Sequence, residues 1–154
     1  MKKKRLLVLL LAADAIWIWF ILNRSSQSAA VSSEESGWVL AHVQRVLPFV
    51  TMHLLRKAAH FSEFAILGCL FFATWHLIKK PGILVPAGFG LLVAVCDELL
   101  QLSSEGRSCE LRDILLDFTG VLTAVLMLRL LLHLLRKRQM RDQKTAEIKN
   151  RFRV

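Results

Sequence analysis

Cysteine is scarce in this sequence, which contains only Cys69, Cys96 and Cys109. No two of them form a C-x-x-C pair, and their odd number gives no indication of a disulfide framework. Cys69 and Cys96 lie in apolar stretches, so we expect them to be small buried hydrophobic side chains. Cys109 is expected to be a loop thiol.

Acidic residues are also in the minority, with 12 Asp and Glu against 21 Lys and Arg and a net charge of +9. In a soluble protein this excess would favour nucleic-acid binding. Here the basic residues cluster just outside long apolar blocks, where they set the orientation of membrane-spanning helices. We therefore expect the partner of this chain to be a lipid bilayer and not a nucleic acid.

Long apolar blocks dominate the chain, in which 55% of residues are hydrophobic, against roughly 45–50% in soluble domains. A helix of about 20 apolar residues crosses a hydrocarbon core of about 30 Å. The sequence predicts an all-α, polytopic four-helix transmembrane bundle. Its expected spans are 6–22, 58–78, 83–102 and 113–135, within one membrane domain (1–135) that is followed by a basic tail (136–154).

The first block follows a basic start and therefore resembles a signal peptide. It is long, it ends in W-I-W-F at 17–20, and no clear A-x-A site follows, so we expect an uncleaved span. Residues 23–37 predict a polar loop. Residues 38–56, which include Pro48, predict an amphipathic segment on the outer membrane surface. A helix packed on the bundle is the alternative for that segment.

The distribution of Lys and Arg predicts the orientation of the spans. With the N-terminus inside, fourteen Lys and Arg lie on the inner side and six on the outer side. Because cytoplasmic loops carry an excess of basic residues, both termini are expected in the cytoplasm.

Several polar and ionisable side chains fall within or beside the expected spans, where charges cost roughly 2.5–3.5 kcal/mol each at mid-bilayer. Many are spaced i, i+4 or i, i+7, so they share a helix face. They form three groups: Arg56, His60 and Glu63; Asp97, Glu98 and Gln101; and Arg107, Asp113, Asp117 and Gly120.

The predicted topology places all three groups within about two helical turns of the outer face. Convergence from three separate segments predicts one polar site. Gly120 would allow another helix or a ligand to approach closely. Two further charges, Asp14 and Arg129, lie at matching depths toward the inner side, so we expect a structural ion pair; Arg129 could instead extend to the interface.

The sequence resembles the VanZ-like family, which is named for a protein associated with teicoplanin resistance. The resemblance rests on R-K-A-A-H-F-S-E-F at 56–64, D-E-L-L-Q at 97–101 and S-S-Q at 25–27. Gly106, Arg107, Asp113 and Gly120 complete the motifs, and the similarity covers roughly 6–135. It implies a bacterial, multi-pass protein of the cytoplasmic membrane that is linked to glycopeptide susceptibility or the cell envelope.

The chain departs from the family pattern at one position. The family usually has Asn four residues after the acid of the fourth span, where this chain has Asp117. The extra carboxylate could strengthen cation binding or pair with Arg107. The loop between Gln101 and Gly106 also lacks a proline that is common in the family.

Three functions remain open for the predicted polar site. It could bind an envelope precursor, a lipid head group, a glycopeptide antibiotic or a partner membrane protein, with Arg56 and Arg107 on anionic groups. It could belong to a membrane enzyme, with His60 as a general base oriented by Glu63 or Asp97. It could also be an ion-pair network that only locks the helices together. A divalent cation is a possible cofactor, with Asp97, Glu98, Asp113 and Asp117 as ligands.

Overall fold

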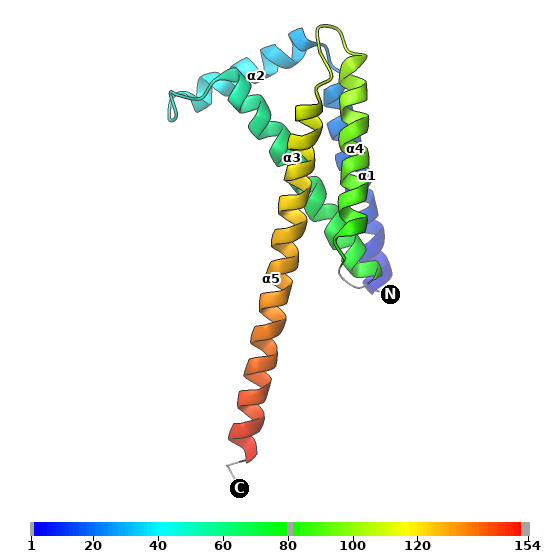
Figure 1. Ribbon diagram of the computed structural model, residues 1–154, viewed down its shortest axis with the longest axis vertical. Coiled ribbons are helices and arrows are strands. Elements are labelled where there is room, and N and C mark those ends of the chain that lie inside the picture. Colours follow the sequence, from blue (N-terminus) through cyan, green and yellow to red (C-terminus); the bar gives the residue numbers. More distant parts are fainter. Residues whose placement is uncertain (1, 80–81, 152–154) are drawn as a thin grey trace.

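The computed structural model describes residues 2–79 and 82–151, which form five helices (Figure 1). No strand occurs in these described ranges, so the predicted all-helical class is confirmed. The helices are α1 (Lys2–Ser25), α2 (Ala29–Val43), α3 (Met52–Ile78), α4 (Leu84–Leu102) and α5 (Leu111–Arg151).

Four of these helices, α1, α3, α4 and α5, are long and apolar enough to cross a membrane. Each coincides with one predicted span, although α3 begins at Met52 rather than at residue 58. Only 11% of the apolar 18-residue stretch of α1 is buried against the rest of the protein, as expected for a helix whose remaining surface faces lipid. Cys69, which was expected to be buried, is exposed on the surface of α3.

The segment after the first span is more helical than the sequence suggested. Residues 23–37, expected to form a polar loop, lie mostly in helices, because α2 begins at Ala29. Ser28 caps α2, since its hydroxyl accepts a hydrogen bond from the amide of Val31. This cap stabilises the start of a helix within a Ser- and Glu-rich stretch.

Residues 38–56 do not form one amphipathic segment, so that prediction is wrong in its bounds. They are divided between the end of α2, a turn that contains Pro48, and the first turn of α3. Proline lacks an amide hydrogen and interrupts the helix. Thr51 then starts α3, because its hydroxyl accepts a hydrogen bond from the amide of Leu54.

The four long helices run lengthwise, while α2 projects sideways from one end (Figure 1). We call this end the upper end; it is formed by the last turns of α1 and α4 and the first turns of α3 and α5. The start of α1 lies at the opposite, lower end, and α5 extends well beyond it (Figure 1). The upper end is thus the one that the predicted topology assigns to the outer face.

Close approach of α3 and α5 defines the centre of the bundle. A Cβ atom on Gly120 would lie 2.5 Å from the carbonyl oxygen of Phe61, and one on Gly68 would lie 2.7 Å from that of Val121. Small residues allow such contacts between membrane helices, so Gly120 admits a helix, as anticipated. The apolar core around this contact comprises Ile21, Phe64, Leu67, Phe72, Val93, Ala94, Val121 and Val125.

Asp14 and Arg129 do not pair, so the expected ion pair between them is wrong. Buried Asp14 accepts a hydrogen bond of 2.7 Å from the hydroxyl of Thr74 on α3. Arg129 is exposed, and none of the ion pairs among the described residues includes it. Inside a bundle, a hydroxyl on a neighbouring helix can donate a hydrogen bond to a carboxyl group. A long arginine side chain can instead extend to the membrane interface.

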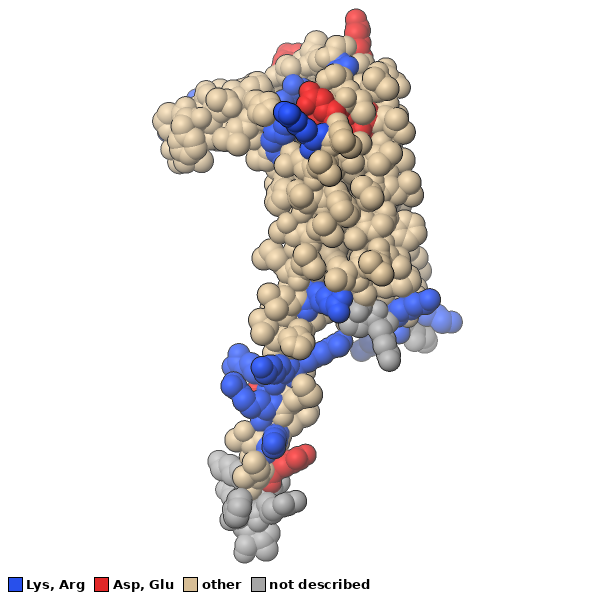
Figure 2. Space-filling view, viewed as in Figure 1, with Lys and Arg blue, Asp and Glu red and all other residues tan. Residues whose placement is uncertain are grey.

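Charge is distributed unevenly along the molecule. Figure 2 shows Lys and Arg around the lower end and along the projecting part of α5, and a mixture of both signs at the upper end. A broad band without charge separates the two regions on this face (Figure 2). The basic tail continues α5 as a helix as far as Arg151.

Candidate functional site

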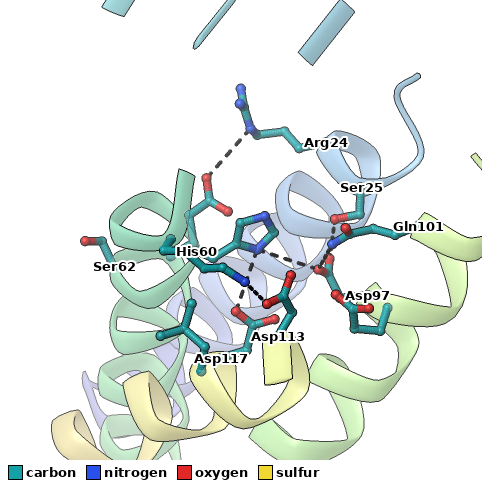
Figure 3. Close-up of polar contacts among 12 residues, drawn as sticks. Arg24, Ser25, His60, Ser62, Asp97, Gln101, Asp113 and Asp117 are labelled. Atoms are coloured by element: carbon teal, nitrogen blue, oxygen red, sulfur yellow. Dashed lines mark hydrogen bonds and ion pairs between the residues drawn. The ribbon is translucent and has the colours of Figure 1, made fainter. Parts of the chain in front are cut away.

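The upper end of the bundle gathers polar side chains from α1, α3, α4 and α5 (Figure 3), and the α4–α5 loop lies beside them. The close contact of α3 with α5 brings the first turns of both helices beside the last turn of α4. The convergence expected from helical spacing is therefore present in the fold. The residues are Arg56, His60 and Glu63 on α3; Asp97, Glu98 and Gln101 on α4; Arg107 in the α4–α5 loop; and Asp113 and Asp117 on α5.

At the centre of this group, His60 faces two carboxylates from two other helices (Figure 3). Its Nδ1 lies 3.6 Å from Oδ1 of Asp117 and 3.9 Å from Oδ2 of Asp97. Both aspartates are 0% exposed. Neither oxygen of Asp117 has a hydrogen-bond partner among the described residues, and the same holds for Nδ1 of His60. Buried polar atoms without partners are costly and call for an explanation.

Asp97 is held in place by two neutral hydrogen-bond donors. The hydroxyl of Ser25, at the end of α1, donates to Oδ1. The amide of Gln101, one turn later on α4, donates to Oδ2 over 3.0 Å. Ser104 in turn donates to the backbone carbonyl of Ser25 over 3.0 Å, which ties the end of α1 to the α4–α5 loop. The orientation of Asp97 therefore depends on three segments of the chain.

Arginines lie above this acidic centre. A cavity of about 160 Å³ is lined by Arg24, Arg56 and Arg107 together with His60. A second cavity of about 460 Å³ lies toward the α4–α5 loop and shares Arg56, His60 and Arg107 with the first. Burial, and next to it the positive charge of Arg56, lower the pKa of the Arg107 guanidinium. Carboxylates line the cavities as well: Glu35 and Glu63 in the first, Glu110 and Asp113 in the second. Arg24 pairs with Glu35 and Glu63, and Lys57 pairs with Asp113, so the charges of Arg56 and Arg107 are the ones that an anion would stabilise.

Three of the predicted acids are engaged elsewhere. Asp113 forms an ion pair with Lys57. Glu98 is 0% exposed and accepts a hydrogen bond of 2.8 Å from the backbone amide of Glu110. Glu63 faces Arg24, with Nε and Oε1 3.7 Å apart. The four-carboxylate cation site expected from the sequence is therefore not assembled: Asp97 and Asp117 meet at His60, but Glu98 and Asp113 do not join them.

Several residues of the site were not anticipated. Arg24 and Ser25 lie at the end of α1, and Ser32 on α2 accepts a hydrogen bond of 3.0 Å from Arg56. The S-S-Q motif at 25–27 was a signal for Ser25, because it accompanies the other motifs of the resemblance. Nothing in the spacing of Arg24 or Ser32 pointed to the site, since they come from a segment that was expected to be a loop.

The arrangement suits metal binding or proton transfer better than nucleophilic attack by serine. Ser62 points away from His60 (Figure 3) and donates to the carbonyl of Ala58. Ser25 donates to Asp97 and not to the imidazole, so the order of a Ser-His-Asp triad is not reproduced. By contrast, an imidazole nitrogen and two carboxylate oxygens converge, as in a metal or acid–base centre.

Comparison with known proteins identifies a family. The family model described as VanZ/LLP1 matches residues 10–133, which include all of the converging side chains. No curated protein and no solved structure matches the chain.

Proposed function

This chain belongs to the VanZ/LLP1 family, and from this membership and its arginine-lined cavities we propose that it binds an anionic head group at the upper end of the bundle. The ligand is the phosphate or carboxylate of an envelope lipid or a lipid-linked cell-wall precursor. Through this ligand we propose a link to glycopeptide (teicoplanin-type) susceptibility.

The state of Arg56 and Arg107 carries this proposal. Arg24 is already paired with Glu35 and Glu63, but neither Arg56 nor Arg107 forms an ion pair with any described acid. Buried or half-buried guanidinium groups favour bidentate contacts with phosphate or carboxylate. Arg56 donates a hydrogen bond to the uncharged hydroxyl of Ser32, and Nε of Arg107 has no acceptor among the described residues. An anionic ligand would supply the charged acceptors that both guanidinium groups lack.

The depth of the cavities supports a lipid as the source of the anion. The cavities are lined by residues from the first turns of α3 and from the loop between two apolar helices. Charged head groups occupy this level of a bilayer, just outside its hydrocarbon core. An acyl chain attached to the head group would then lie along the exposed apolar surface of the helices.

Binding of a short-chain lipid phosphate to the purified protein in detergent tests the proposal. Dioctanoyl phosphatidic acid is expected to bind more tightly than dioctanoylglycerol, which has the same chains without the phosphate. Arg56→Gln and Arg107→Gln are each expected to weaken binding about 10–100-fold, because a hydrogen bond to a charged group contributes about 1.5–3 kcal/mol. Calorimetric titration measures both effects.

Arg45→Gln is the matched control, because Arg45 is an exposed arginine in the turn between α2 and α3. It is expected to leave the affinity unchanged. Equal affinity for the phosphate and the neutral lipid, or equal loss in all three variants, would contradict the proposal. In cells, the two site variants are expected to alter teicoplanin susceptibility at unchanged levels of folded protein.

A membrane enzyme is the second candidate function, and the position of His60 favours it. This imidazole lines both cavities and also meets Asp97 and Asp117. A base in that position could accept a proton from a water or hydroxyl group beside a bound phosphate. Turnover of a radiolabelled lipid phosphate by the wild type but not by His60→Gln would distinguish this function from binding alone.

The proposed function requires the upper end to face away from the cytoplasm, with the protein in the cytoplasmic membrane and both of its termini in the cytoplasm. A reporter fused after Val154 is therefore expected to show a cytoplasmic signal, and one inserted at exposed Ser103 a periplasmic or extracellular signal. The excess of Lys and Arg at the lower end is the physical reason. The reverse pair of signals would show that the upper end faces the cytoplasm. The site could then not bind a ligand in the outer leaflet.

A further inference from the structure

We propose that His60, Asp97 and Asp117 bind a divalent transition-metal ion, of the type of Zn²⁺ or Mn²⁺. This goes beyond the proposed function and rests on different side chains. The anion is assigned to Arg56 and Arg107, whereas the metal would lie below them among three helices. Either site can be present without the other.

The ligand atoms are close enough to share an ion. One nitrogen of His60 and one oxygen from each aspartate all lie within 4.8 Å of one another. Ligand atoms placed about 2.0–2.2 Å from a tetrahedral Zn²⁺ are about 3.3–3.6 Å apart. The observed separations of 3.6 and 3.9 Å from Nδ1 to the two carboxylates therefore need to shorten only by a few tenths of an ångström.

The state of Asp117 favours a bound cation. Its side chain is 0% exposed, and neither carboxylate oxygen has a hydrogen-bond donor among the described residues. A protonated carboxyl group could donate to Nδ1 of His60, which lies 3.6 Å away, but this bond would leave the second oxygen of Asp117 without a partner. A metal ion would occupy the lone pairs of Asp117 and of His60 Nδ1 together. Asp117, where the family usually has Asn, would then act as a metal ligand.

The surroundings of Asp97 match those of a metal ligand. Ser25 and Gln101 each donate one hydrogen bond to this carboxylate and so fix its orientation. Carboxylates that bind metals are commonly oriented in this way by outer hydrogen bonds. Because imidazole is a ligand, the set suits Zn²⁺ or Mn²⁺ better than Ca²⁺ or Mg²⁺, which prefer oxygen alone. Three protein ligands leave a coordination position free for water or another small ligand.

Metal titration of the purified, chelator-treated full chain in detergent tests this inference. We expect about one Zn²⁺ or Mn²⁺ ion per chain and a rise in the melting temperature on binding. Asp97→Asn, Asp117→Asn and His60→Gln are each expected to weaken binding by about 100-fold or more, and Ser25→Ala and Gln101→Ala by about 10–100-fold. Glu34→Gln is the control, since this acid is exposed on α2 and should not affect metal affinity.

Asp117→Asn also separates a metal site from a purely structural ion-pair network. If the metal is the missing partner, this variant melts at the same or a higher temperature than the wild type without metal, and loses the rise that metal causes. If the network is the whole explanation, the variant melts at a lower temperature and the wild type does not respond to metal, which overturns the proposal. Metal binding of undiminished affinity in Asp117→Asn is adventitious, for example at an exposed thiol, and also overturns it.

Discussion

Replacement of Gly120 by valine is expected to separate α3 from α5 and to prevent stable folding. Even the first side-chain atom at this position would lie 2.5 Å from the carbonyl oxygen of Phe61 and 3.2 Å from the backbone nitrogen of Ala65. Both contacts are with backbone atoms, which cannot move aside as a flexible side chain can. Overpacking typically costs about 1–3 kcal/mol, and we expect Gly120→Val to reach or exceed the upper value.

Gly88→Val is a matched control for this effect. Gly88 lies on α4 inside a membrane span, and a Cβ atom added there would meet nothing within 4 Å. The yield of monodisperse protein and its melting temperature should therefore fall strongly for Gly120→Val and little for Gly88→Val. Similar losses in both variants would mean that the cost arises from valine in a helix and not from the contact between α3 and α5.

The contact at Gly120 also matters for the site. Asp117 lies one turn before Gly120 on α5, and His60 lies next to Phe61 on α3. The carbonyl of Phe61 against Gly120 therefore sets the distance between the imidazole and this carboxylate. Gly120→Ala, a smaller change, is expected to fold in part and to weaken whatever His60 and Asp117 bind together.

Replacement of Glu98 by alanine is expected to release the start of α5 from α4. Glu98 is 0% exposed, and its Oε2 accepts a hydrogen bond of 2.8 Å from the amide of Glu110, immediately before the first residue of α5. A carboxylate in this place also meets the positive end of the α5 dipole. Loss of a hydrogen bond to a charged group costs about 1.5–3 kcal/mol, and Glu98→Ala also opens a small cavity.

Glu98→Gln is the informative comparison, because its side-chain oxygen can still accept from Glu110 while the charge is lost. Thermal unfolding should order the proteins as wild type, Glu98→Gln and Glu98→Ala, from most to least stable. The α4–α5 loop contains Arg107, so Glu98→Ala should also weaken binding of the lipid phosphate. Equal stability of the wild type and Glu98→Ala would show that Glu98 does not hold the loop.

The sequence alone was sufficient to predict the membrane bundle. Apolar blocks long enough to cross a bilayer predict spanning helices whatever they pack against, because the backbone in lipid must satisfy its own hydrogen bonds. The alternation of direction then placed three distant polar groups at the same end. Periodicity also identified the helix faces on which His60, Asp97 and Asp117 lie.

The segment between the first two spans was predicted less well for a local reason. Neither strong apolar periodicity nor a membrane constraint acts on residues 23–56. Helix formation there depends on single capping hydroxyls at Ser28 and Thr51 and on the break at Pro48. Such signals are weaker than a long apolar run, so the helix α2 and its contribution of Ser32 were missed.

The choice of partners was decided by the tertiary structure. Helical spacing tells which side chains share a face, but the rotation and separation of neighbouring helices decide which of them meet. Close contact at Gly120 brings Asp117 to His60, while Asp113, one turn earlier, reaches Lys57, and Glu98 reaches the backbone of Glu110. These three similar acids thus acquire different roles, because hydrogen bonds and ion pairs form only over a few ångströms.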